Sequence, residues 1–328
     1  MTNSKSKQVH THDHDADHNH NHSHDHGHSH TSEKVSNAIG ENTKIELIVD
    51  KKTAQKAYAN ALKKIAPKLK LSGFRKGKVP TQVAEKEIGT AEIIQQALED
   101  VLPDIYRETI TKLKKQPLTH PDIRPVSIEK DEEWKLIAEI AEAPAVDIKK
   151  YKDLVKKAVK TAETEWQKLI KEQKSDKNAE IQSENDQIKR KESFTLGEIY
   201  KNLVLTLKPA IPELLVRREV EGELQTLQRQ LQSVKMTLQD FLERRKITPQ
   251  QLSEQIAAEV VARLQLNVIL GAIANQEKLS VSDQDYQDYL SKSSDPSIAE
   301  QAKQDPYYES WIRDTVLKQK ITDFLLKI

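Results

Sequence analysis

Long segments with apolar residues at helical spacing fill the C-terminal part of this 328-residue chain and limit its folds most strongly. The clearest starts at Pro249, which suits a first helical turn, after Thr248, which suits an N-cap. It runs to about residue 278, and its predicted apolar face comprises Ile256, Val260, Val261, Leu264, Val268, Ile269, Ala272 and Ile273. The chain has only eight glycines, 5% aromatic and 31% charged residues. That composition favours long, solvated helices over a compact β fold.

Residues 193–328 are therefore predicted to form a mostly α-helical domain. Further helices are expected at 213–235, 238–245, 283–290 and 306–328. Their apolar stripes are modest and their charges alternate, so we expect an elongated, open array with exposed grooves. Four apolar side chains near the C-terminus are either buried between helices or available to another polypeptide: Trp311, Phe324, Leu325 and Leu326.

Residues 43–150 are predicted to form a small α+β domain, because short alternating segments flank helical ones. The expected elements are a strand at 44–49, a helix at 51–69, a loop at 71–80, a short helix at 81–89, a longer helix at 91–115, and strands at 123–128 and 134–141. Thr81 is expected to cap the short helix. Pro103 lies inside the longer helix, where a proline favours a kink.

Residues 151–192 form a highly charged segment between these two domains. Its first half, 151–173, has a helical apolar stripe that includes Leu154, Val155 and Trp166. Its second half, 174–191, is almost entirely polar. We expect a charged helical linker here.

Residues 1–42 form a histidine-rich, low-complexity tail with too few apolar residues to build a core, so disorder is expected. Ten histidines alternate with Asp, Asn and Ser: His10, His12, His14, His18, His20, His22, His24, His26, His28 and His30. One interpretation is weak binding of zinc or nickel by pairs of imidazoles. The alternative is a solvated tail or an expression tag. A catalytic metal site is not expected, because such a tail holds no fixed geometry.

The sharpest local feature is a loop framed by two glycines. Its residues are Gly73, Phe74, Arg75, Lys76, Gly77, Lys78, Val79 and Pro80. Glycine permits backbone conformations that are closed to other residues, and Pro80 holds the residue before it extended. Between the glycines stand one aromatic and two cationic side chains. A stiff loop of this kind suits a surface made of protein and phosphate, because Arg offers bidentate contacts and Lys a point charge.

The helix before this loop is strongly basic. Residues 51–78 contain ten cations and no Asp or Glu: Lys51, Lys52, Lys56, Lys63, Lys64, Lys68, Lys70, Arg75, Lys76 and Lys78. The net charge of the whole chain is only +1, so the positive charge is concentrated here. Such a patch attracts RNA phosphate. Charge alone would fit an ordinary solvated helix face, and the adjoining glycine-framed loop favours a binding surface.

On these residues the chain resembles the trigger factor family. Residues 73–80 match the family's ribosome-docking signature without a break. The resemblance continues through Ala84, Ile88, Gly89, Leu98, Leu102, Pro103 and Tyr106. It resumes at residues 211–215, at Leu266, Ile269, Leu270, Ile273, Ala274 and Glu277, and at residues 281–283.

The resemblance implies an ATP-independent molecular chaperone that docks at the ribosomal exit tunnel and holds nascent polypeptides. Residues 74–76 would contact a ribosomal protein at the tunnel rim, with ribosomal RNA facing the basic helix. The helical domain would hold unfolded nascent chains. A homodimer off the ribosome is a further expectation, and no cofactor is expected.

The chain departs from the family between its two domains. Family members usually carry a prolyl isomerase domain of roughly a hundred residues there, whereas this chain has only residues 151–191. A proline pocket needs several strands and clustered aromatics, and this segment offers only Tyr151 and Trp166. We therefore expect no isomerase activity. Two alternatives stay open: a peptidyl-prolyl isomerase acting in protein folding, and a metal-handling maturation factor that uses the histidine tail.

Other classes of function find no support in the sequence. There is no cysteine, which excludes disulfides and thiolate chemistry and fits the cytosol. No phosphate-binding glycine loop or dinucleotide fingerprint is present. The N-terminus lacks a secretory signal, and no stretch approaches the roughly 18 apolar residues of a spanning helix, so a cytoplasmic protein without a membrane partner is expected.

Overall fold

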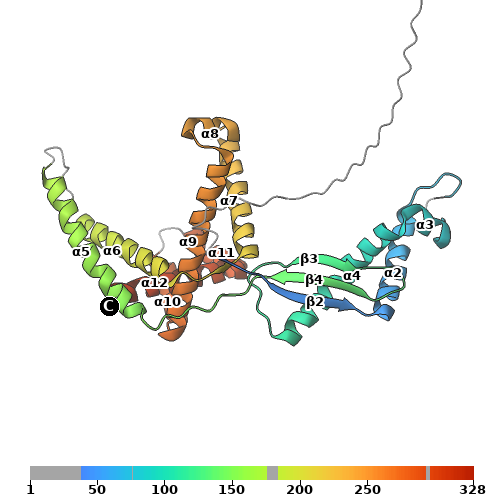
Figure 1. The fold of residues 1–328 in the computed structure, drawn as a ribbon, viewed down its shortest axis with the longest axis horizontal. Helices are drawn as coiled ribbons and strands as arrows, with labels where there is room; N and C mark the ends of the chain where they lie inside the picture. The colour runs from blue at the N-terminus through green and yellow to red at the C-terminus, as the bar shows by residue number, and fades with distance from the viewer. Residues whose placement is uncertain (1–37, 76, 176–183, 293–295) are drawn as a thin grey trace, which may run out of the picture. The chain divides into compact units, whose positions relative to one another are not determined.

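The computed structural model describes residues 38–75, 77–175, 184–292 and 296–328 (Figure 1). Its N-terminal part combines an antiparallel sheet with helices. From residue 151 onward the described chain is helical apart from one short strand. The predicted fold class, an α+β domain followed by a mostly α-helical domain, is confirmed.

A three-stranded antiparallel sheet organises the N-terminal domain, with β4 (Trp134–Ile140) between β2 (Thr43–Val49) and β3 (Asp122–Ser127). Alternate residues of β2 point into the core, so Leu47 is buried opposite Leu136 of β4. This two-residue period is the one that the sequence shows, and it fixes the register of the pair because a one-residue slip would expose the apolar set.

Four helical segments share one core with this sheet. They are α2 (Lys51–Ile65), the short 3-10 helix η1 (Ala66–Lys68), α3 (Thr81–Ile88) and α4 (Thr90–Leu113). α2 and α4 pack together, and their apolar faces join the sheet in one core. Asp50 begins α2, since its carboxylate accepts a hydrogen bond from the backbone N–H of Thr53 at 3.1 Å.

Two expectations about these helices need correction or refinement. Thr81 does not cap α3: the N-cap position is Pro80, and Thr81 is the first helical residue. The reason is that Pro80, already extended at ψ 143°, ends the loop one residue earlier than expected. α4 continues through Pro103 and ends at Leu113, because Lys114 takes a left-handed conformation at φ 52°.

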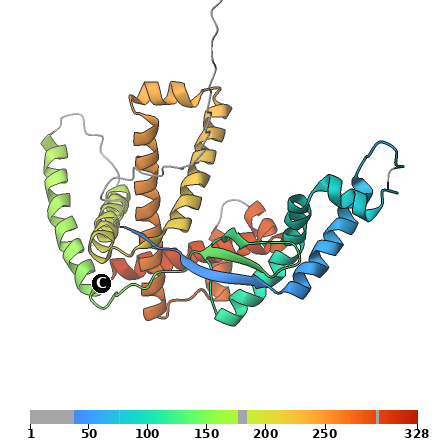
Figure 2. The ribbon, with the colours of Figure 1, turned by 45° about the vertical axis from the view of Figure 1, so that its right-hand side comes forward.

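The helical domain contains two helix pairs and a C-terminal group. Its elements are α5 (Tyr151–Ser175), α6 (Glu184–Leu207), β5 (Ile211–Pro212), α7 (Glu213–Ser233), α8 (Leu238–Arg245), α9 (Pro249–Gln276), α10 (Asp283–Lys292), α11 (Pro296–Gln304) and α12 (Pro306–Leu326). α5 lies beside α6, and α7 beside α9, with α8 across the ends of the second pair (Figure 2). α11 was not expected from the sequence.

The apolar residues of this domain form separate clusters rather than one core. One joins α5, α6, α9 and α12 around Ile199, Ile269 and Leu325. A second joins α7 and the first half of α9 around Leu214 and Val260. A third, smaller cluster joins α10, α11 and α12. α9 contributes to the first two clusters, which makes it the central helix of the domain.

The described parts of the segment 151–192 are helical, as predicted, but they pack into the helical domain instead of forming a linker. α5 packs into the first helical cluster through Tyr151, Val155 and Ala158. α6 begins at Glu184 and runs through the expected boundary at 192 to Leu207. The segment therefore belongs to the helical domain, because its sparse apolar residues repeat at helical spacing and α6, α9 and α12 cover them.

A short strap of chain connects the two domains. β1 (Ile39–Gly40) pairs in parallel with β5, which directly precedes α7. The side chain of Asn42 accepts a hydrogen bond from the N–H of Leu214 at 2.8 Å and donates one to Glu213 and one to Glu139, each at 3.1 Å. Asn42 thus satisfies an otherwise free N–H at the start of α7. The prediction that the disordered tail extends to residue 42 is therefore wrong for residues 38–42, because β5 and the start of α7, distant in the sequence, hold them.

α9 is long and apolar enough to cross a membrane by length and composition, contrary to the expectation that no stretch reaches that level. It is the one such helix among the described residues. Its mixed packing explains the composition: different sides of the helix face α7 near its start and α6 and α12 near its end. Core helices of globular proteins can have the same length and apolar composition, so these two properties are weak evidence for a membrane-spanning helix.

Candidate functional site

The loop between η1 and α3 has the backbone that its two glycines predict. Gly73 and Gly77 both take positive φ, at +87° and +79°. The N–H of Phe74 bonds to the carbonyl of Leu71 at 3.2 Å, and the N–H of Lys78 bonds to the carbonyl of Arg75 at 2.9 Å. Two successive turns therefore shape the loop, and a side chain at either glycine would be strained.

The loop presents its side chains to solvent. Phe74 is 41% exposed, which is unusual for a large aromatic in a domain with its own core. Arg75, Lys78 and Pro80 are exposed as well, whereas Val79 packs against the domain core. Lys76 lies outside the described residues. The structure thus brings the described members of the predicted site together on one loop.

The basic residues around the loop are accessible. All of the described ones are exposed: Lys51, Lys52, Lys56, Lys63, Lys64, Lys68, Lys70, Arg75 and Lys78. Among them, and within the described chain, only Lys64 forms an ion pair, with Asp100 of α4 at 2.7 Å. We call the loop 71–80 together with these cations the docking surface. Its charge is largely uncompensated, so it can attract an anionic partner.

A polar cluster holds α3, and with it the end of the loop, against the domain. Glu85 of α3 accepts hydrogen bonds from the Tyr58 hydroxyl at 2.9 Å and from Lys130 Nζ at 2.5 Å. The hydrogen bond from Lys130 is the main reason that the pKa of Glu85 lies below its ordinary value. Burial is the main reason that the pKa of Tyr58 lies above its own. The sequence did not indicate this cluster, because its members are far apart in the chain.

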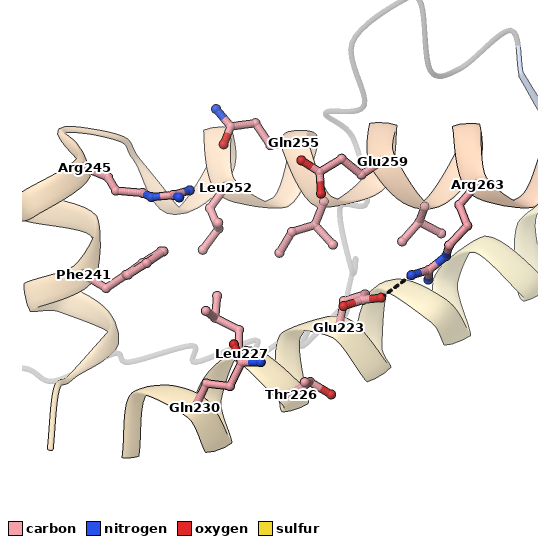
Figure 3. A pocket seen from close by; sticks show the side chains of 12 residues that line it. Glu223, Thr226, Leu227, Gln230, Phe241, Arg245, Leu252, Gln255, Glu259 and Arg263 are labelled. Carbon is pink, nitrogen blue, oxygen red and sulfur yellow. Dashed lines mark hydrogen bonds and ion pairs between the residues drawn. The ribbon is translucent and has the colours of Figure 1, made fainter. Parts of the chain in front are cut away.

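The second candidate site is a groove between α7 and α9, which α8 closes at one end (Figure 3). Its volume is about 560 Å³, within the range of ligand pockets. Twelve residues line it: Glu223, Thr226, Leu227, Gln230, Phe241, Arg245, Leu252, Gln255, Ile256, Glu259, Val260 and Arg263. The sequence predicted exposed grooves in this domain but did not single out these residues.

Local capping fixes the helices that form this groove. At the start of α8, Thr237 and Asp240 bond reciprocally to each other's backbone N–H, at 3.1 and 3.2 Å. Thr248 and Gln251 do the same at the start of α9, at 3.1 and 2.8 Å. The predicted N-cap at Thr248 is confirmed, and these capping boxes define where α8 and α9 begin.

The C-terminal aromatic residues divide between surface and core. Trp311 is 54% exposed and stacks on Tyr308, with ring centroids 5.5 Å apart. Leu325 is fully buried in the first helical cluster, and Phe324 and Leu326 are partly buried against it. Of the four side chains considered, Trp311 is thus the most available to another polypeptide.

The metal-binding prediction concerns residues 10–30. The ten histidines from His10 to His30 lie outside the described residues. Among the described residues, no group of three or more His, Asp or Glu side chains is placed to hold a metal ion.

Comparisons with known proteins agree on one family. Residues 31–174 match the family model "Bacterial trigger factor protein (TF)", and residues 170–327 match the model of its C-terminus. The trigger factor of Limosilactobacillus reuteri is 35% identical over 133 residues, which are 40% of this chain and 30% of that protein. The trigger factor of Lactococcus lactis is 30% identical over 155 residues, which are 47% of this chain and 33% of that protein.

A solved structure shares the fold. It comes from a study of promiscuous substrate recognition in folding and assembly by the trigger factor chaperone. The TM-score is 0.56 at 14% sequence identity, and the match covers 87% of this chain and 96% of that one. The sequence matches to the curated relatives span only about a third of those proteins. The two family models meet at residues 170–174, near the end of α5.

Proposed function

The chain belongs to the trigger factor family of ribosome-associated chaperones, and we propose that it docks at the ribosomal exit tunnel and holds nascent polypeptides without ATP. The observation that carries this proposal is the exposed Phe74–Arg75 pair on a glycine-framed loop beside unpaired cations. The proposal includes the cytoplasm as its location, and no membrane partner.

Docking would combine two physical contributions. Phe74 would bury apolar surface against a ribosomal protein at the tunnel rim, since an aromatic held ready on a loop loses little entropy on binding. Arg75 and the lysines of α2 would contact phosphates of ribosomal RNA, with release of counterions. We therefore expect affinity to fall steeply with salt, and the fall to be shallower when cations of the docking surface are removed.

Holding would fall to the helical domain. Its apolar residues are divided among separate clusters, and its groove and exposed aromatics leave apolar surface open. Several weak apolar contacts can bind an unfolded chain and release it by mass action, so no nucleotide is required. A homodimer off the ribosome is part of the proposal, and sedimentation at several protein concentrations would test it.

We propose that this chain holds polypeptides without isomerising prolines. The meeting of the two family models at 170–174 supports this, since no segment between them is left for an inserted domain. A proline-limited refolding assay tests it. Faster refolding at substoichiometric protein would contradict the proposal, whereas suppressed aggregation at an unchanged refolding rate would agree with it.

Co-sedimentation with ribosomes at low salt tests the docking proposal. Replacing Phe74, Arg75 and Lys76 by Ala should abolish binding. A matched control replaces Lys156, Lys157 and Leu169 of α5 by Ala, which removes two exposed cations and one exposed apolar side chain elsewhere. Full binding by the loop variant, or equal loss in the control, would show that this loop is not the docking surface.

A second proposal concerns the histidine tail, because ten imidazoles within residues 10–30 are a dense set of metal ligands. We propose that the tail binds zinc or nickel weakly and buffers it. Calorimetric titration of either ion into the full chain, and into a variant with these ten histidines changed to Ser, tests the idea. Equal affinity in both proteins would show that the histidines of the tail do not bind the metal.

A further inference from the structure

The groove between α7 and α9 has an apolar centre that is only partly covered. Leu227 of α7, Ile256 of α9 and Phe241 of α8 line it. Figure 3 shows Leu227 and Leu252 on opposite sides of the groove and Phe241 at its α8 end. Leu227, Ile256 and Phe241 are partly exposed, whereas Leu252 and Val260, which also line the groove, are buried. A space of about 560 Å³ with this lining can take a few apolar side chains of another chain.

Internal ion pairs neutralise the charges at the end of the groove away from α8. Arg263 of α9 donates to Glu223 at 2.5 Å and to Glu219 at 3.0 Å, both on α7. These bonds join the two helices, and they are the main reason that the pKa of Arg263 lies above its ordinary value. Neither Arg263 nor Glu223 is therefore free to recognise an incoming charge.

Two other charges that line the groove have no ion-pair partner among the described residues. Arg245 of α8 stacks on Phe241, with its guanidinium carbon 5.1 Å from the ring centroid. Glu259 of α9 is exposed and likewise unpaired within the described chain. Figure 3 places Arg245 at the α8 end and Glu259 towards the Glu223–Arg263 end. The groove thus offers a free cation at one end of its apolar centre and a free anion towards the other end.

We propose that this groove binds an extended segment of unfolded polypeptide in which apolar side chains are flanked by one acidic and one basic residue. The acidic residue pairs with Arg245 and the basic residue with Glu259. This rests on the proposed holding function and adds a preference to it: the groove selects segments of mixed charge over segments with a single sign. Complementary charges suppress wrong partners as well as favouring right ones.

The preference should be modest and measurable. Ion pairs at exposed sites contribute about 0.2–1 kcal/mol, so each pair gives at most about a fivefold change in affinity. Weak selection of this size suits a holding protein, because no single segment would be retained for long.

Three capped, fluorescein-labelled peptides with the same leucine- and phenylalanine-rich centre test the proposal by anisotropy with the full chain. One is flanked by a glutamate and a lysine, one by two glutamates and one by two lysines. The mixed peptide should bind tightest, by up to about fivefold over each of the others. Arg245→Glu should shift the preference towards the dilysine peptide, and Glu259→Lys towards the diglutamate peptide.

Matched controls separate the groove from overall charge. Arg244→Glu and Glu254→Lys make the same changes on the same helices, at residues that do not line the groove. They should leave the ranking of the three peptides unchanged. Circular dichroism would check that every variant keeps its helices, and Phe241→Ala should weaken all three peptides alike.

Several results would overturn the proposal. These are equal affinity for the three peptides, an equal response of groove and control variants, or no measurable binding of any peptide. A change in self-association caused only by the groove variants would instead make the groove a contact between copies. Suppression of aggregation by the unaltered chain is measured separately: if it fails while the peptides still rank as expected, the holding function fails and the groove specificity stands.

Discussion

The docking surface and the groove differ in how their shape is fixed and in the sign of their free charges. The docking surface lies where regular structure stops, and two glycines at positive φ set its shape. Its charge has one sign. The groove is built from regular helices whose ends are fixed by capping boxes, and its free charges have both signs.

The difference follows from the kind of partner each region is proposed to meet. A surface for one fixed partner gains from a stiff backbone, because less entropy is lost on binding. A surface for many unfolded partners gains from broad apolar contact with small, separate electrostatic preferences. On this contrast, substitutions near the docking surface should alter binding through the backbone and the core beneath it. Substitutions near the groove should alter binding through individual charge pairs.

The largest expected effect is on the core beneath the docking surface. Trp134 is almost fully buried, and its ring N–H donates to the carbonyl of Glu129 at 2.9 Å. Trp134→Ala should destabilise the N-terminal domain by about 3–5 kcal/mol. Trp311→Ala, the same change at an exposed site in the helical domain, should stay within about 0.5 kcal/mol. Hydrogen exchange in the full chain would measure both, at β2 and β4 for the first variant and at α12 for the second, and comparable losses would contradict the contrast.

The next effect concerns Gln265, the one buried polar side chain among the residues that the structure describes. Gln265 of α9 is 5% exposed and donates to the carbonyl of Pro209 at 2.9 Å. Gln265→Ala leaves that carbonyl unpaired and should cost about 1–3 kcal/mol in urea unfolding. Gln255→Ala, at an exposed position on the same helix, is the control and should change little. An unaltered midpoint for Gln265→Ala would show that the bond to Pro209 does not hold α9.

Glycine substitutions sharpen the contrast between loop and helix. Gly77→Ala places a side chain at φ +79°, which should cost about 1–2 kcal/mol and weaken ribosome co-sedimentation. Gly197→Ala in α6 meets no atom within 4 Å and should stabilise that helix by up to about 1 kcal/mol. Docking would be unchanged in the second variant. Unchanged co-sedimentation of both variants would mean that ribosome binding does not depend on the backbone conformation of the loop.

The smallest expected effect depends on pH and lies in the helical domain. Asp285 accepts hydrogen bonds from Lys320 Nζ at 2.7 Å and from the Ser282 hydroxyl at 2.6 Å, and the bond from Lys320 is the main reason that its pKa lies well below the ordinary 3.8. A lowered folded-state pKa stabilises the fold above the unfolded pKa, and this is lost as pH falls below it.

Asp285→Asn should therefore lower stability at neutral pH and flatten the acid dependence below about pH 4. Thermal unfolding across that range measures it. Asp288→Asn, which removes an exposed carboxylate on the same helix, should alter the slope less. A steeper acid dependence in the Asp285 variant would contradict the assignment.

Much of the fold followed from periodicity and punctuation in the sequence. The two-residue period gave β2 and β4, and the helical period gave α2, α4, α7 and α9, with Thr248 correctly placed as the cap of α9. The segment 151–192 was misjudged because its apolar residues are few among many lysines and glutamates. Only packing against α6, α9 and α12 shows that those few residues form a buried face.

The sequence by itself determined the docking loop, because glycine conformation and a run of cations without an Asp or Glu are local properties. It also determined the positions of most strands and helices, since their periods need no distant partner. The tertiary structure alone decided what depends on residues far apart: the strap through Asn42, the cluster that holds Glu85, and the groove. Arg263 and Glu223 are forty residues apart, and only the packing of α7 on α9 reveals which charges remain free.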